Sequence, residues 1–184
     1  MALFVAIEID DVARGALVRA MGDLAAAGPQ LRLERPEKLH VTVAYLGKVD
    51  TQRLDAFEDA LARAADACPP FAIEFDCLGP FGDSRKPRII ALRCSRPQPG
   101  FAACAAAVRA QYEALGVVFE HEALAHVTVA RARNGLGTLA RIETELPCIL
   151  AVRELALFES VPAGPTTRYE RRSTAPLQTT RSRR

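Results

Sequence analysis

One tetrapeptide occurs twice in this chain of 184 residues. His40-Val-Thr-Val43 and His126-Val-Thr-Val129 are identical, lie about half a chain length apart, and contain two of the three histidines. Each is rich in β-branched residues and favours a strand, in which residues i and i+2 share one face. Each histidine therefore points the same way as the threonine two positions later, with the valines in the core behind them. Two such strands across a groove would present two imidazoles and two hydroxyls to one small ligand.

The hydrophobic pattern divides the chain into strands and helices. Strands are expected at 3–9, 39–47, 71–78, 88–94, 117–120, 125–131, 148–158 and 167–176, helices at 11–27, 51–67 and 100–115, and a loop with one helical stretch at 134–145. Both halves hold a helix between strands and one strand with a histidine, and no linker separates them. Residues 1–177 are therefore expected to form a single two-lobed domain, and the apolar-free segment 178–184 a disordered basic tail.

Composition excludes several classes of protein. Hydrophobic residues make up 49% and charged residues 25%, which is typical of a globular protein. No apolar run is long enough to cross a membrane, and the first residues read as a strand and not as a signal peptide. The net charge is +2, and three arginines lie in the last four residues. The folded body is thus near neutral, which argues against a strongly basic nucleic-acid binder, so an anionic substrate needs a local site.

The five cysteines are odd in number, widely spaced and without a CxxC motif. We therefore expect free thiols in a reducing cytoplasm, and neither a disulfide framework nor a zinc ribbon.

The paired motifs resemble those of the two-histidine phosphoesterase superfamily, and within it those of the RNA 2′,3′-cyclic phosphodiesterases, the tRNA half-ligase-like (LigT-like) family. The resemblance extends over nearly the whole chain. It is carried by the opening strand at 4–7, the first motif at 35–47, a loop and strand at 78–90, the second motif at 126–131 and a closing segment at 160–169. One departure is Ala125, where the family usually has proline before the second histidine.

The resemblance implies an α+β fold of two similar lobes with pseudo-twofold symmetry, each a mainly antiparallel sheet covered by helices, around an active-site cleft. It implies that His40 is the proton donor, His126 the proton acceptor, and that Thr42 and Thr128 hold the phosphate oxygens. The expected activity is metal-independent hydrolysis of a 2′,3′-cyclic phosphate, at an RNA end or in a small cyclic nucleotide, to a 2′-phosphate. No cofactor, no membrane and a monomer are expected.

Alternatives remain open at this point. The same site run in reverse could join RNA halves through a 2′-5′ linkage, or it could hydrolyse another small cyclic nucleotide. A non-catalytic RNA-end binder is a third reading, against which the two intact motifs argue. A zinc site is disfavoured because two histidines are too few, and an odd offset turns His121 away from His126 on a shared strand. His121 is therefore expected to be a surface or core residue.

Other basic and aromatic residues are weaker candidates. Strict alternation places Arg131 and Tyr45 on the core side of their strands. The family that the chain resembles nevertheless retains an arginine at the position of Arg131. Arg131 is accordingly a candidate for phosphate binding or for a structural ion pair, and Tyr45 for packing. Arg85, Lys86 and Arg88 surround a turn-rich loop and could contact the RNA backbone or form a solvated charge run.

Overall fold

The computed structural model describes residues 1–28, 31–83, 85–141, 143–164 and 166–178. Short strands and three α-helices alternate along this part of the chain. In chain order they are β1 (Ala2–Glu8), α1 (Asp11–Ala27), β2 (Arg32–Leu33), η1 (Pro36–Lys38), β3 (His40–Lys48), η2 (Thr51–Arg53), α2 (Leu54–Asp66), β4 (Phe71–Phe81), β5 (Ile89–Arg93), α3 (Pro99–Glu113), β6 (His126–Arg131), η3 (Gly137–Arg141), β7 (Thr144–Val152), β8 (Glu154–Ala163) and β9 (Thr166–Pro176), where η denotes a 3-10 helix. Of the expected tail at 178–184, residues 179–184 lie outside the described residues, and the backbone N–H of Gln178 donates a 3.1 Å hydrogen bond to the carbonyl of Cys68.

The strands form one open antiparallel sheet, in the order β7-β4-β5-β6-β3-β1-β8-β9, with β2 added beside β6. The sheet has two halves, which meet where β3 pairs with β6 at Val41 and Val127. The predicted α+β class is confirmed. The halves are not the first and second halves of the sequence, however, because β1, β3, β8 and β9 unite the two ends of the chain while β4 to β7 come from its middle.

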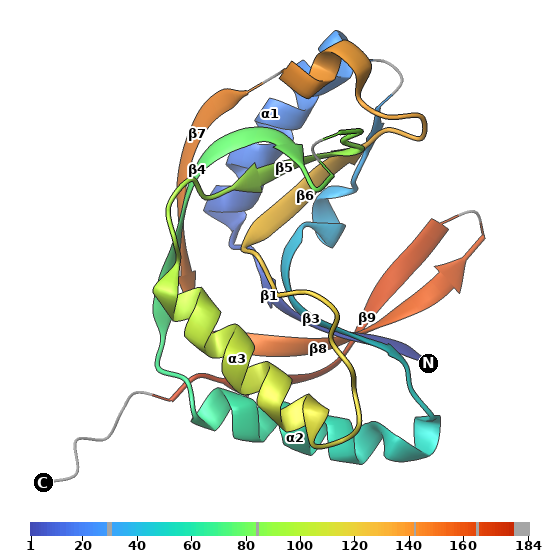
Figure 1. The fold of residues 1–184 in the computed structure, drawn as a ribbon, viewed down its shortest axis with the longest axis vertical. Helices are drawn as coiled ribbons and strands as arrows, with labels where there is room; N and C mark the ends of the chain where they lie inside the picture. The colour runs from blue at the N-terminus through green and yellow to red at the C-terminus, as the bar shows by residue number, and fades with distance from the viewer. Residues whose placement is uncertain (29–30, 84, 142, 165, 179–184) are drawn as a thin grey trace, which may run out of the picture.

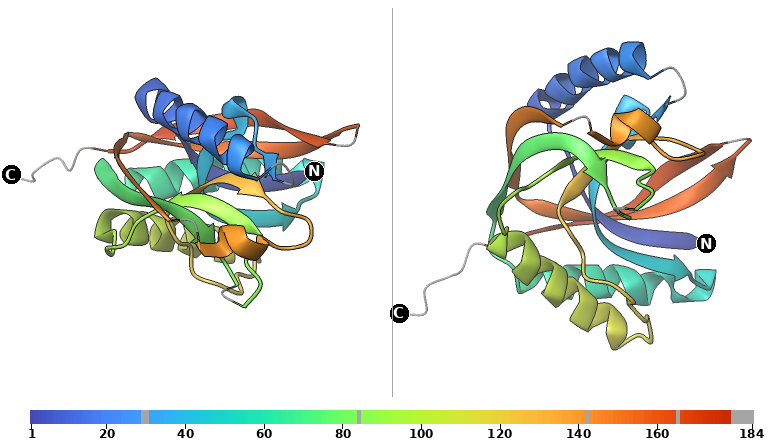
Figure 2. Two further views of the ribbon diagram at one scale, coloured as in Figure 1. Left: turned by 90° about the horizontal axis from the view of Figure 1, so that it is seen from above. Right: turned by 45° about the horizontal axis from the view of Figure 1, so that its top comes forward.

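The helices cover the two halves of the sheet differently (Figures 1 and 2). Helix α1 packs against β6 and β7, and its Leu17 and Met21 are buried, as the periodicity predicts. Helix α2 packs against β8 and β9, while α3 lies along α2 and also contacts β3 and β4. Buried Tyr112 of α3 donates a hydrogen bond of 3.0 Å from its hydroxyl to the carbonyl of Phe57 in α2. Helix α3 thus fastens the two halves together.

A β-bulge interrupts each of the two strands at its paired motif, and β3 has a further register shift beyond its motif, where Leu46 is skipped. On β3, Val5 pairs with Ala44 and Ala6 with Thr42, so that Val43 is skipped. On β6, Ile90 pairs with Ala130 and Ala91 with Thr128, so that Val129 is skipped in the same way. An extra residue at a bulge reverses the facing of every side chain beyond it. The two motif strands therefore have the same backbone irregularity as well as the same sequence.

Three sequence-based expectations are wrong in detail. Residues 117–120 contain no strand, and β2 was not predicted. The apolar run 148–158 is extended, but at Arg153 the chain leaves the β7 edge of one half and enters β8 in the other. Hydrophobic patterning detects an extended buried run, but it cannot show that the run changes partners.

Candidate active site

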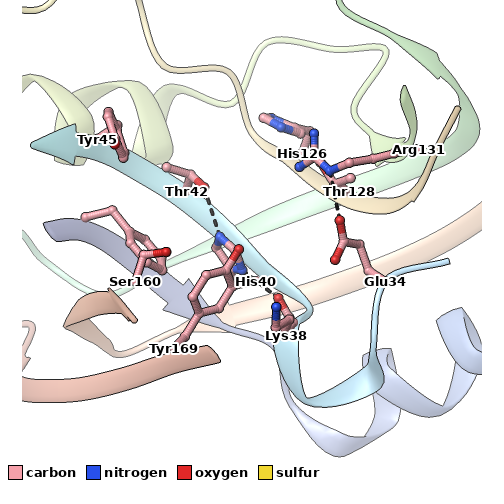
Figure 3. A pocket seen from close by; sticks show the side chains of 11 residues that line it. Glu34, Lys38, His40, Thr42, Tyr45, His126, Thr128, Arg131, Ser160 and Tyr169 are labelled. Carbon is pink, nitrogen blue, oxygen red and sulfur yellow. Dashed lines mark hydrogen bonds and ion pairs between the residues drawn. The ribbon is translucent and has the colours of Figure 1, made fainter. Parts of the chain in front are cut away.

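Both motifs face one pocket at the seam between the two halves of the sheet (Figure 3). Its volume is about 180 Å³, and His40, Thr42, His126 and Thr128 all line it, as the pattern predicts. The antiparallel pairing of Val41 with Val127 places the motifs head to tail. Each histidine therefore lies near the threonine of the other motif, and the pair of imidazoles lies diagonally across the pocket.

Each imidazole is oriented by a backbone carbonyl two residues before it. Nδ1 of His40 lies 2.6 Å from the carbonyl oxygen of Lys38, and Nδ1 of His126 lies 2.8 Å from that of Leu124. Since a carbonyl oxygen only accepts, Nδ1 must donate in both rings. A neutral imidazole then carries its lone pair on Nε2, which is the nitrogen that can exchange a proton with a ligand. Nε2 of His40 lies 3.0 Å from the hydroxyl oxygen of Thr42.

Aromatic rings hold the two imidazoles in different ways. The ring of His126 stacks on Phe81, with centroids 4.0 Å apart and planes 20° from parallel. The ring of His40 meets Tyr169 edge-on, at 5.3 Å and 89°, and Phe4 at a tilt, at 5.2 Å. The two motifs thus have the same sequence, but their histidine rings have different aromatic neighbours.

Burial lowers the pKa of both imidazoles. For His40, the Lys38 carbonyl and the carboxylate of Glu34 raise the pKa, whereas the charges of His126 and Arg131 lower it further. For His126, the Leu124 carbonyl raises the pKa and Arg131 lowers it, with no carboxylate among the causes. The charge of His126 thus disfavours the protonated form of His40, whereas the carboxylate of Glu34 favours it.

The bulges bring two further residues into the pocket. Arg131 and Tyr45 lie at equivalent positions beyond the two bulges, and both line the pocket. The expectation that they point to the core side is wrong, because strict alternation fails at a bulge. Tyr45 is 62% exposed, and the Nε of Arg131 donates a hydrogen bond of 2.8 Å to Oε1 of Glu34.

Lys38, Glu34, Tyr169 and Ser160 also line the pocket, and sequence reasoning did not select them (Figure 3). Nζ of Lys38 lies 4.9 Å from the ring centre of Tyr169 and 3.3 Å from the hydroxyl of Thr167.

The sequence contained a signal for the equivalence of Tyr45 and Arg131, since the repeat of the two motifs continues through Ala44 and Ala130. Alternation assigns both alanines to the cleft, yet both are buried, because each follows the residue skipped at a bulge.

A larger apolar groove adjoins the pocket and is here called the side groove. It has a volume of about 500 Å³, shares Tyr45, Thr42 and His126 with the pocket, and is otherwise lined mainly by Phe81 and the segment 118–124. Arg109 of α3 holds that segment by donating to the carbonyl of His121 at 2.8 Å. His121 itself is exposed, as expected.

The remaining candidates lie elsewhere. Arg85, Lys86 and Arg88 are exposed and line neither the pocket nor the side groove, so their contact with RNA stays a prediction. Within the described part of the chain, no group of three or more His, Cys, Asp or Glu side chains is arranged to hold a metal ion. No described helix is long and apolar enough to cross a membrane.

Comparisons with known proteins find sequences similar to this chain. Residues 7–91 match the family model described as LigT like phosphoesterase. An RNA 2′,3′-cyclic phosphodiesterase of Archaeoglobus fulgidus is 28% identical over 90% of this chain and 95% of its own length.

Solved structures share the fold. TT0787 of Thermus thermophilus has a TM-score of 0.86 at 22% identity and covers 98% of this chain and 100% of its own. E. coli LigT complexed with 3′-AMP has a TM-score of 0.74 at 24% identity, with 97% and 98% covered. The resemblance inferred from the motifs is confirmed.

Proposed function

We propose that this chain, which resembles LigT-like phosphoesterases in sequence and in fold, hydrolyses the 2′,3′-cyclic phosphate at RNA 3′ ends to a 2′-phosphate. One observation carries the proposal: two imidazoles, each with Nδ1 committed to a backbone carbonyl, turn Nε2 into a pocket that also holds two threonine hydroxyls. Acid–base catalysis at a phosphodiester needs two proton-transfer groups on opposite sides of phosphorus and donors for the oxygens between them.

The roles of the four motif residues follow from this arrangement. Neutral His126 takes a proton from water through Nε2 while the water oxygen forms a bond to phosphorus. Protonated His40 gives its Nε2 proton to the ribose 3′-oxygen as the bond from phosphorus to that oxygen breaks. Thr42 and Thr128 donate hydrogen bonds to the non-bridging oxygens. One turnover consumes one water and forms a phosphate monoester on the 2′-oxygen; His126 then loses its proton to solvent and His40 regains one from solvent, which restores the starting state.

The charge near His40 favours this order of acid and base. The carboxylate of Glu34 raises the pKa of His40, whereas no carboxylate is among the causes that shift the pKa of His126. A nearby negative charge stabilises an imidazolium, which is the form that a general acid requires. Glu34 is thus a difference in surroundings that supports His40 as the acid, although burial and the positive charges of His126 and Arg131 lower the pKa of His40.

The connectivity of ribose orients the substrate. A leaving 3′-oxygen near His40 puts C3′ and the upstream chain on that side, so that C1′ and its base extend toward His126. The side groove opens on the His126 side, and exposed Tyr45 offers a ring at its entrance. Aromatic side chains stack on bases with little sequence preference.

The pocket alone, at about 180 Å³, is smaller than typical ligand pockets of about 300–1,000 Å³, which fits a role limited to the phosphate and part of the ribose.

We further infer that the protein works as a monomeric, single two-lobed unit over residues 1–177 in the cytoplasm. All five cysteines are free, which fits a reducing compartment. The seam through the active site and the packing of α3 on strands of both halves fit one domain.

The test is direct. Purified protein is incubated with a short RNA that ends in a 2′,3′-cyclic phosphate, and the products are separated and identified. We expect a 2′-monophosphate from the wild type, and almost none from His40→Ala or His126→Ala. A protein that binds this RNA without converting it would be an RNA-end binder, and release of a 3′-monophosphate would reverse the assigned leaving group.

A further inference from the structure

The phosphate pocket contains a carboxylate. Glu34 follows the two-residue strand β2, and its backbone N–H donates a 2.8 Å hydrogen bond to the carbonyl of Val129, which extends the pairing of β2 with β6. This fixes the backbone beside the bulge of β6. The side chain of Glu34 is only 17% exposed and pairs with Nε of Arg131 at 2.8 Å (Figure 3). A negative group is therefore built into a site proposed to bind an anion.

This carboxylate offsets one of two permanent positive charges. Among the residues that line the pocket, Lys38 and Arg131 are always cationic near neutral pH, and Glu34 is the one carboxylate. Its ion pair uses Nε of Arg131, so the two terminal nitrogens of the guanidinium are left out of that bond. Arg131 is 45% exposed and thus open to a ligand on the pocket side. The pocket keeps its hydrogen-bond donors while its net positive charge is reduced.

The proposed reaction changes the charge of the phosphate. A cyclic phosphodiester carries one negative charge, whereas the 2′-monoester carries close to two at neutral pH, since its second pKa is about 6. The added charge arises inside the pocket, next to the carboxylate of Glu34. A pocket that contained both cations and no carboxylate would hold the product more tightly than the substrate.

We propose that Glu34 is a specificity-determining residue that makes the pocket prefer phosphate diester monoanions and release phosphate monoester dianions. The inference rests on the proposed function. According to this proposal, the site selects ligands by their charge. It accepts cyclic and linear phosphate diesters and discriminates against terminal monophosphates, including its own product. Glu34 acts on the ligand directly through its charge, and on Arg131 by using the Nε donor.

A purely structural role is the competing explanation. Glu34 could serve only to hold the guanidinium of Arg131 in place, as other glutamates do on the surface of this molecule. Glu34→Gln separates the two explanations, because glutamine has the same shape and its carbonyl oxygen can still accept from Nε. The substitution removes the charge and leaves the geometry.

The experiment compares two constants in each protein. The KM for adenosine 2′,3′-cyclic phosphate and the inhibition constant of adenosine 2′-monophosphate are measured for wild type and E34Q. We expect the inhibition constant to fall about tenfold in E34Q, while the KM changes less than about threefold, because a partly buried charge acts more strongly on a dianion. An unchanged ratio of the two constants, or equal tightening of both, would overturn the proposal.

Glu8→Gln is the matched control. Glu8 also pairs with an arginine, Arg171, at 2.9 Å, and it lies opposite His40 in the register of β1 with β3, but it does not line the pocket. Its loss should leave the ratio of the two constants at the wild-type value. A shift equal to that of E34Q would show a general effect of surface charge and would also contradict the proposal.

Failure of the proposed function gives a different result. Absence of turnover in the wild type would refute cyclic phosphodiesterase activity, yet calorimetric titration with both ligands would still measure the charge preference. The wild type also gives a test that needs no variant. At about pH 8 it should bind the 2′-monophosphate no more tightly than the monoanionic methyl ester of that phosphate. Tighter binding of the dianion would overturn the assignment even if E34Q failed to fold.

Discussion

His40 and His126 begin identical sequences but occupy different surroundings. His40 lies among Phe4, Tyr169 and the carboxylate of Glu34, whereas His126 stacks face to face on Phe81. The neighbours of each histidine side chain belong to other strands. Two strands with the same sequence can therefore have different neighbours. The difference gives each histidine its own chemistry, and it can be measured with substrates whose leaving groups differ.

The first prediction concerns the general acid. On a cyclic phosphate both His40→Ala and His126→Ala should lose nearly all activity, because ribose leaves poorly without a proton. On a nitrophenyl phosphodiester that the wild type accepts, His40→Ala should recover much of the wild-type rate, since nitrophenolate leaves unprotonated. His126→Ala should not recover, as water still needs its base. Recovery by His126→Ala in place of His40→Ala would reverse the two roles.

The second prediction is a bell-shaped pH profile displaced to the acid side. Activity requires protonated His40, so it falls as pH rises through that pKa, and neutral His126, so it falls as pH drops through the other. Burial lowers both pKa values from the ordinary 6.5, and kcat/KM reports the free enzyme. Its optimum should therefore lie below 6.5, whereas the optimum of kcat should lie higher because a bound anion stabilises imidazolium. A kcat/KM optimum above about pH 7.5 would contradict this reading.

At the scale of elements, the bulges explain what the sequence revealed and what it did not. The positions of His40, Thr42 and their counterparts follow from strand periodicity alone, which holds over the first three residues of each motif. Beyond them the bulge inverts the pattern, and the simple rule fails for Tyr45 and Arg131. Glu34 could not have been selected, because it reaches the pocket through β2, a strand of two residues without a hydrophobic pattern of its own.

The third prediction follows from the bulge of β3, which turns Tyr45 toward the pocket. Tyr45→Ala should raise the KM for an RNA cyclic phosphate roughly tenfold, in line with the loss of one base-stacking contact. A nitrophenyl phosphodiester without a base provides the control and should be hydrolysed as by the wild type. Equal losses on both substrates would show that Tyr45 supports the pocket and does not bind the base.

The fourth prediction concerns the start of α1. Asp10 caps this helix, since its carboxylate accepts a 2.7 Å hydrogen bond from the backbone N–H of Ala13. Asp10→Ala should lower the free energy of unfolding by about 1 kcal/mol, measured by urea denaturation. Asp11→Ala is the neighbouring control: the side chain of Asp11 is fully exposed and its ion pair with Arg14 is long, at 3.8 Å, so its effect should be clearly smaller. Equal effects would mean that the capping bond contributes little.

At the scale of the whole molecule, the class of fold was predictable and the partition of the chain was not. Alternating helices and strands with one motif in each half of the sequence indicated two lobes. In the structure, one half of the sheet combines strands from both ends of the chain, because β8 pairs with β1 and β9 pairs with β8. Strand pairing over such sequence distances leaves no local pattern, and the extended run through Arg153 even hides the crossing.

The fifth prediction is that turnover survives a strong chelator. His40, Lys38, Arg131 and two threonine hydroxyls supply the positive charge and the donors that a phosphodiester needs. The rate with excess EDTA should therefore equal the untreated rate. Loss of activity that one divalent metal restores would replace the proposed mechanism with a metal-assisted one.

An open sheet also has two edges, here β7 and β9. Pro147 within β7 offers no amide N–H, and β9 carries the charged side chains of Arg168, Glu170 and Arg172. A second copy that approached the β7 edge would lack one hydrogen-bond donor there, and one that approached the β9 edge would meet a row of charged side chains. Both devices prevent strands from extending a sheet between molecules. The molecule therefore keeps its long hairpin of β8 and β9 in water without offering it as a template for aggregation.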